Sequence, residues 1–94
     1  MKLLMIIVDE EKKEELEVLM QRSGVTGYTE LPHALGLGAT GQRLGSRAYP
    51  KTSAVIFTVI AEPMLATLVQ EIKSYCQGCD ERLKMIVWGV EEVL

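Results

Sequence analysis

Two apolar stretches decide the fold of this chain: Leu-Leu-Met-Ile-Ile-Val at residues 3–8 and Ala-Val-Ile-Phe-Thr-Val-Ile at residues 54–60. Both are short and rich in β-forming residues, which predicts buried strands. Each is followed by a segment whose apolar residues recur at helical spacing: Leu16, Leu19 and Met20 after the first, and Leu65, Leu68, Val69, Ile72 and Cys76 after the second. The sequence therefore contains two strand–helix units.

Two more extended segments follow these units. Residues 28–35 predict a strand at an edge or with a bulge, because Pro32 cannot donate a ladder hydrogen bond. Met85–Trp88 begins the last strand, after Gly78 ends the second helix. We expect Asp9 to cap the first helix. The order strand, helix, strand, strand, helix, strand predicts an α+β, ferredoxin-like βαββαβ fold, with a four-stranded antiparallel sheet and two helices on one face.

Length and composition limit the classes of protein that the chain can represent. Its 94 residues fit one domain, residues 1–94, with 48% hydrophobic residues and a net charge of −3. The acidic balance argues against a nucleic-acid partner. No apolar run is long enough to span a bilayer, and the apolar stretch at 3–8 runs into acids without a signal-peptide cleavage site. We expect a cytoplasmic protein with no membrane insertion.

The composition of the strands predicts self-association. Two helices cover one face of such a sheet, and a face in contact with water should carry alternating polar residues. Residues 3–8 contain no polar side chain, and residues 54–60 contain only Thr58. A cyclic homo-oligomer would bury the second face. The alternative is that these strands are simply rich in β-forming residues.

The segment from residue 36 to about residue 52 is predicted to be a long loop with a functional role. It carries Arg43, Arg47 and Lys51, and no acidic residue occurs between Glu30 and Glu62. This basic character suits a phosphate-bearing ligand or an acidic partner surface, although solvated side chains would explain it too. The loop also contains a G-x-G-x-x-G pattern at residues 36–41, but Gly45 and Pro50 leave no room for the helix that a dinucleotide site needs.

The two cysteines form a single C-x-x-C pair, Cys76 and Cys79, at the end of the second helix. They can be inert thiols, a reversible disulfide or part of a metal site shared between subunits with His33 as a further ligand. No nucleophile–base pair or cluster of carboxylates stands out, so the sequence predicts no enzyme activity and no catalytic residue.

Four segments together resemble the nitrogen-regulatory PII signal-transduction proteins. Gly24-Val25-Thr26-Gly27-Tyr28-Thr29 is similar to the family's entry to its second strand, and Gly36-Leu37-Gly38 to the start of its long T-loop. Residues 55–59 and 84–90 resemble its third and fourth strands. Residues 44–50 are similar to a segment of the shorter PII-like branch. Before the last strand, the chain keeps only Lys84 of the family's phosphate-binding loop.

The resemblance implies a homotrimer with clefts between its subunits, in which an adenine nucleotide of the ATP, ADP or AMP type binds. It implies ligand-binding roles for Thr29, Gly36, Gly38 and Lys84, to which the charge pattern adds Arg43 and Arg47. It also implies that a T-loop, here residues 36–52, docks onto a partner protein such as a transporter, enzyme or regulator. Two alternatives remain: a trimer resembling the CutA-type divalent-cation tolerance proteins, with His33, Cys76 and Cys79 as candidate ligands, and a redox sensor that uses the C-x-x-C pair.

Overall fold

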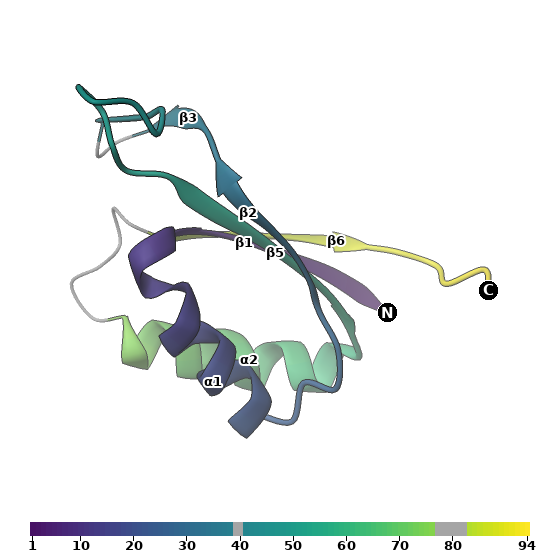
Figure 1. Cartoon of the computed structure of the whole chain (residues 1–94). Coiled ribbons are helices and arrows are strands. Elements are labelled where there is room, and N and C mark those ends of the chain that lie inside the picture. The colour runs from purple at the N-terminus through teal and green to yellow at the C-terminus, as the bar shows by residue number, and fades with distance from the viewer. Residues whose placement is uncertain (39–40, 77–82) are drawn as a thin grey trace.

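The computed structural model describes residues 1–38, 41–76 and 83–94. Its main sheet has four antiparallel strands in the order β2-β5-β1-β6, and both α-helices lie on one face of it (Figure 1). The elements are β1 (Lys2–Asp9), the 3-10 turn η1 (Glu10–Lys12), α1 (Lys13–Arg22), β2 (Thr29–Ala34), β3 (Gly36–Gly38), β4 (Gly41–Arg43), β5 (Ser53–Ile60), α2 (Glu62–Tyr75) and β6 (Leu83–Gly89). The predicted antiparallel sheet with two helices on one face is confirmed.

The core lies between the helices and the sheet. Alternate residues of the two central strands point to this inner face, and Leu4, Ile6 and Ile56 are completely buried there. Leu16 and Met20 of α1 and Leu68 and Ile72 of α2 close the core from the other side. The helical spacing seen in the sequence thus corresponds to the buried stripe of each helix.

The polar residue of β5 also lies on this inner face. Thr58 is 2% exposed, and its hydroxyl donates a hydrogen bond of 2.8 Å to the carbonyl oxygen of Gly27. Burial of a hydroxyl requires such a partner. Because Thr58 points to the inner face, the opposite face of β5 carries no polar residue except Ser53 at the start of the strand.

β2 is an edge strand, as Pro32 predicted, and its pairing with β5 is irregular between Leu31 and Ala34. Pro63 lies in the first turn of α2, where a missing N–H is tolerated. Within the described ranges, no helix combines the length and hydropathy that crossing a membrane would require.

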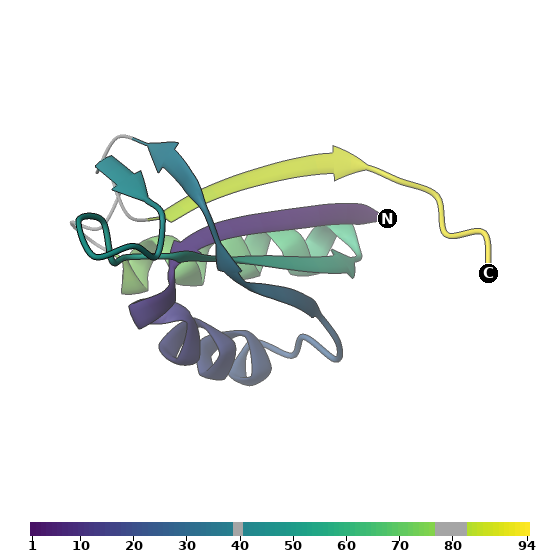
Figure 2. The ribbon, with the colours of Figure 1, turned by 45° about the horizontal axis from the view of Figure 1, so that its top comes forward.

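Two expectations about local structure are wrong. Asp9 does not cap a helix: it belongs to β1, makes no capping hydrogen bond, and is followed by the 3-10 turn η1. Residues 36–52 are not entirely irregular, because β3 and β4 pair as a two-stranded ribbon at one end of the main sheet (Figure 2). Gly41 begins β4 with a φ of 105°, a conformation that favours glycine. No helix follows the G-x-G-x-x-G pattern, which agrees with its rejection as a dinucleotide site.

Candidate functional site

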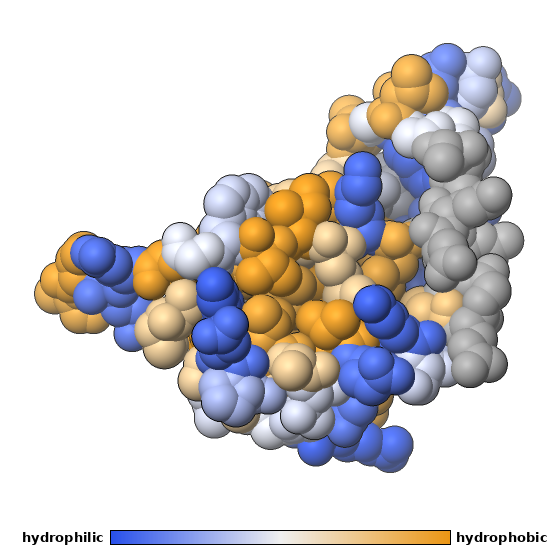
Figure 3. All heavy atoms as spheres, turned by 180° about the vertical axis from the view of Figure 1, so that it is seen from behind, coloured by the Kyte–Doolittle hydropathy of each residue, from blue (hydrophilic) through white to orange (hydrophobic). Residues whose placement is uncertain are grey.

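The face of the main sheet opposite the helices is almost entirely apolar. We call it the outer face, and its apolar side chains are Leu3, Met5 and Ile7 of β1, Val55, Phe57 and Val59 of β5, Leu31 of β2, and Ile86 and Trp88 of β6. Thr29 of β2 and Lys84 of β6 lie on the same face, at its two edges. These side chains are half-buried or exposed, and Figure 3 shows a broad apolar area in the centre of this side of the molecule. Contiguous exposed apolar patches of this kind mark interaction surfaces.

Two of the six predicted ligand-binding residues, Thr29 and Lys84, lie at opposite edges of the main sheet. Thr29 is on β2, which forms one edge and leads into β3, whereas Lys84 is on β6, which forms the other. Three strand spacings separate these edges, about 14 Å at the usual distance between neighbouring strands. Thr29 and Lys84 of one protomer therefore cannot contact the same small ligand directly.

The ribbon of β3 and β4 and the turn that follows form an arm, residues 36–52. Gly36 and Gly38 are on β3, Arg43 is on β4 opposite Gly36, and Arg47 is exposed in the turn before β5. Backbone hydrogen bonds from Leu44 and Ser46 to the carbonyl oxygen of Tyr49 close this turn. The structure thus brings four of the six predicted residues together on one segment.

Glycines 36 and 38 are not required by the protomer itself. Both are exposed, neither has a positive φ, and a Cβ atom at either position would have no neighbour within 4 Å. A side chain could therefore be placed there without a clash inside the chain. A need for glycine at these positions would have to come from a ligand or a second protomer that approaches the backbone closely.

Arg43 is held by an acidic residue of the protein body. Its Nε donates a hydrogen bond of 2.8 Å to Oδ1 of Asp9, and the two side chains are 8% and 6% exposed. Asp9 ends β1, and Arg43 ends β4, 34 positions further along the chain. A buried charge needs such a partner, because desolvation of an isolated ion is costly.

Glu10 contacts both ends of the arm, at His33 shortly before its start and at Thr52, its last residue. One of its carboxylate oxygens accepts hydrogen bonds of 2.7 Å from the hydroxyl of Thr52 and from the backbone N–H of His33, and the other lies 3.0 Å from Nδ1 of His33. The hydrogen bond from Thr52, and then that from His33, lower the pKa of Glu10. His33 has a φ of 56°, an unfavourable conformation that these contacts stabilise.

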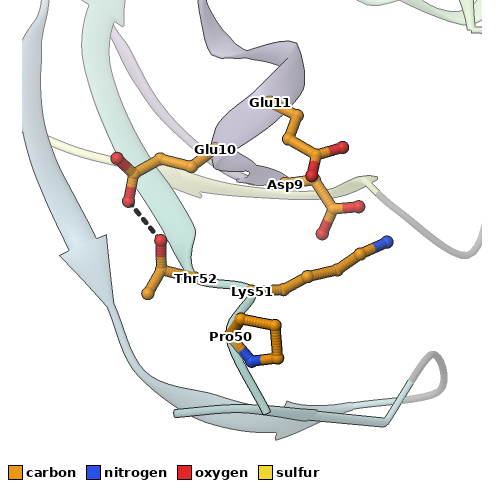
Figure 4. Close-up of a pocket in the computed structure, with 6 residues that line it drawn as sticks. All are labelled: Asp9, Glu10, Glu11, Pro50, Lys51 and Thr52. Carbon is orange, nitrogen blue, oxygen red and sulfur yellow. Dashed lines mark hydrogen bonds between the residues drawn. The ribbon is translucent and has the colours of Figure 1, made fainter. Parts of the chain in front are cut away.

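A small open pocket lies between η1 and the end of the arm (Figure 4). Its lining consists of Asp9, Glu10, Glu11, Pro50, Lys51 and Thr52, and its volume is about 130 Å³. Ligand pockets usually have volumes of about 300 Å³ or more, so this pocket is too small to enclose a nucleotide.

A second group of charges lies between α1 and β2. Lys13 forms a 3.0 Å ion pair with Glu30, and this hydrogen bond raises the pKa of the lysine. Burial and the neighbouring Glu30 raise the pKa of Glu17. Burial, followed by the charge of Glu17, raises the pKa of Tyr28, whose hydroxyl lies 3.4 Å from a carboxylate oxygen of that residue.

Sequence reasoning missed the acidic residues that hold the arm. Asp9 and Glu10 follow an apolar strand, a position equally typical of a helix start. Their partners Arg43 and Thr52 lie more than thirty residues away, and no local pattern connects them. The absence of acids between Glu30 and Glu62 was the one available signal, since it leaves the arm's cations to find acidic partners elsewhere in the chain.

The fold is a ferredoxin-like domain with an additional β-ribbon arm, and the family model "Nitrogen regulatory protein P-II" matches residues 1–94. The chain belongs to the P-II family of nitrogen regulatory proteins. The resemblance inferred from its motifs is confirmed. No curated protein sequence matches the chain.

Solved structures with a similar fold include CPII, a nitrogen regulatory PII-like protein from Thiomonas intermedia K12. Its complex with ADP, AMP and bicarbonate has a TM-score of 0.77 and 24% identity, with 93% of this chain and 82% of that chain covered. A complex of CPII with ADP and bicarbonate gives the same values. The apo form has a TM-score of 0.67 and 20% identity, with 93% and 85% covered. At these identities the likeness shows the fold.

The metal alternative gains no support from the described residues, and the interpretation of Cys76 as an inert thiol is wrong. Cys76 is disulfide-bonded, so its sulfur is not available as a thiolate ligand, and Cys79 lies outside the described residues. His33 contacts Glu10 instead. Among the residues that the structure describes, no group of three His, Cys, Asp or Glu side chains could hold a metal ion.

Proposed function

We propose that this protein is a non-catalytic, cytoplasmic PII-like regulator that assembles as a homotrimer from the single domain 1–94. In this proposal, an anionic effector, an adenine nucleotide, binds in clefts between protomers. Thr29, Gly36, Gly38, Arg43 and Arg47 of one protomer face Lys84 of the next across each cleft. The arm then signals the bound state to a partner protein.

The observation that carries this proposal is that Thr29, on the strand that leads into the arm, and Lys84 lie at opposite edges of one sheet. A cyclic assembly with the outer faces turned inward brings the β2 edge of one protomer to the β6 edge of the next. It also buries the apolar side chains of the outer face. CPII, which has the same fold, is described as bound to ADP, AMP and bicarbonate, which supports an adenine nucleotide as the effector.

The electrostatics of the arm support an anion as the ligand. Arg47 is exposed in the turn of the arm, and Lys84 is exposed near the start of β6. Arginine and lysine are the side chains that bind phosphate groups most often. Although its net charge is −3, the protein therefore presents an exposed cation near each of the edges that the assembly would join.

Calorimetric titration of the full chain with ATP, ADP, AMP and bicarbonate tests the binding step. We expect saturable binding of an adenine nucleotide and a loss of affinity of roughly tenfold or more in Lys84→Ala, because a charge-assisted hydrogen bond to phosphate is removed. Lys73→Ala, which removes an exposed lysine of α2, is the matched control and should bind normally. Absence of binding by the natural chain would contradict the proposal.

Subunit mixing tests whether the site is shared. Gly36→Val should block the arm side of each cleft, and Lys84→Ala should impair the other side. When the two variants are unfolded together and refolded as mixed trimers, some clefts combine the natural arm of one protomer with the natural Lys84 of another. Nucleotide binding should then partly return. A site contained within one protomer would give no recovery.

A further inference from the structure

We propose that Asp9 competes with the anionic effector for the guanidinium group of Arg43, so that effector binding detaches the arm from the protein body. This inference rests on the proposed function and adds the means by which the cleft would control the arm. In the structure, the guanidinium of Arg43 is paired with the carboxylate of Asp9 at 2.8 Å. The same donors would suit the carboxylate-like geometry of a phosphate or bicarbonate group.

The position of Arg43 makes this competition effective. Arg43 lies opposite Gly36 in the ribbon, next to the open backbone that the proposed cleft would use. Its pairing with Asp9 fixes β4 to the end of β1, which lies in the centre of the main sheet. The pairing of Arg43 with Asp9 is therefore one connection between the ribbon and the central part of the main sheet.

In the described part of the arm and the residue before it, the large apolar side chains are mostly exposed. Leu37 is 78% exposed and Leu35 63%, and Leu44 and Tyr49 are also exposed. The polar contacts of Asp9 and Glu10 thus contribute much of what fixes the arm. Glu10 accepts hydrogen bonds from His33 and Thr52, which lie at the two ends of the arm. Release of Arg43 would therefore free the ribbon of β3 and β4 while the two ends of the arm stay in place.

Lys51 could form an ion pair with Asp9 after the pair between Arg43 and Asp9 is broken. Lys51 and Asp9 line the same open pocket, and the lysine side chain extends toward the side where Asp9 and Glu11 lie (Figure 4). An exchange of Arg43 for Lys51 would keep the buried carboxylate paired. The arm would then have two arrangements of similar stability, a condition for a ligand-controlled switch.

Asp9→Asn tests the proposal in the full chain, with Glu14→Gln as the matched control because Glu14 is an exposed acid on α1, outside the pocket that Asp9 and Lys51 line. Titration with ADP should show binding that is tighter by about 5- to 150-fold in Asp9→Asn, the usual range of coupling between two sites, and unchanged in Glu14→Gln. Amide hydrogen exchange without nucleotide should be faster at residues 41–44 in Asp9→Asn alone. Equal or weaker ADP binding by a folded Asp9→Asn would overturn the inference.

The outcomes separate this inference from the proposed function. If the natural chain binds ADP and Asp9→Asn binds no more tightly, the inference fails and the proposed function stands. If only Asp9→Asn binds, the natural chain has no nucleotide-bound state that could release the arm, and both the proposed function and the inference fail. If neither binds, both fail.

The natural chain provides a second test in case Asp9→Asn does not fold. The NMR signal of the Arg43 Nε–H should shift when ADP is added, because the hydrogen bond to Asp9 is replaced. A signal that stays unchanged at saturating ADP would overturn the inference.

Discussion

Both faces of the main sheet are rich in apolar residues, but the helices cover only the inner face. On β1, Leu4, Ile6 and Val8 are covered by α1 and α2, whereas Leu3, Met5 and Ile7 alternate with them on the outer face and remain half-buried. The inner face is completed by the protomer, and the outer face is not. The chain therefore has apolar side chains on both faces of the sheet, but its helices bury only the inner face. We expect assembly because another protomer could bury the outer face.

The largest effect should come from a charge placed on the outer face. Phe57→Glu would put a carboxylate from each protomer into the proposed interface, where burial of each ion costs several kcal/mol. We expect analytical ultracentrifugation to give the mass of one protomer instead of three, with the helical signal in circular dichroism retained. Glu62→Gln, an exposed change at the start of α2, should leave the mass unchanged. A variant Phe57→Glu that still sediments as a trimer would show that the outer face is not the interface.

A pair of neighbouring substitutions on β1 should separate the two faces quantitatively. Ile6→Ala creates a cavity in the completed core and should lower the free energy of unfolding by about 2–4 kcal/mol. Met5→Ala removes a half-buried side chain from the outer face, so its cost should depend on protein concentration, because it acts mainly on assembly. Chemical denaturation at two protein concentrations measures both. A concentration-independent Met5→Ala effect would contradict the proposed role of the outer face.

The smallest effect concerns Glu17, which belongs to the group of charges between α1 and β2. Burial and Glu30 raise the pKa of Glu17 above its unfolded value. Protonated Glu17 therefore favours folding below the unfolded pKa, and this contribution is lost as the pH rises through the folded pKa. Glu17→Gln should raise the melting temperature at pH 7 by about 2–4 °C, equivalent to roughly 0.5 kcal/mol, and should give no gain near pH 4.

Glu14→Gln, an exposed change on α1, is the control for this thermal experiment. If both variants melt at the same temperature as the natural chain at pH 7, ionisation of Glu17 does not destabilise the folded protein.

Much of the fold could be predicted because its signals are local. The strands around residues 3–8 and 54–60, the buried stripes of both helices and the edge position caused by Pro32 follow from spacing and from the chemistry of single residues. The ribbon of β3 and β4 was missed because three-residue strands rich in glycine carry no periodic pattern. Asp9 was misassigned because a helix cap and a strand end have the same local sequence.

The candidate site was predictable only as a set of residue types. A basic, glycine-rich segment in an acidic chain suggested an anion-binding site, and that site stays a prediction. Gly36, Gly38, Arg43 and Arg47 belong to this segment, whereas Thr29 and Lys84 lie on β2 and β6 of the main sheet. The pairing of Arg43 with Asp9 could not be inferred, because it depends on where β4 lies relative to the end of β1.

The sequence by itself determined the order of the elements and the apolar character of both sheet faces, since hydrophobic spacing and turn residues act over a few positions. Only the tertiary structure decided which face the helices cover, that the predicted ligand residues Thr29 and Lys84 lie at opposite sheet edges, and that two consecutive acids hold the arm. The physical reason is that a buried charge selects its partner by proximity in the folded chain, and proximity across more than thirty residues is set by packing rather than by any local pattern.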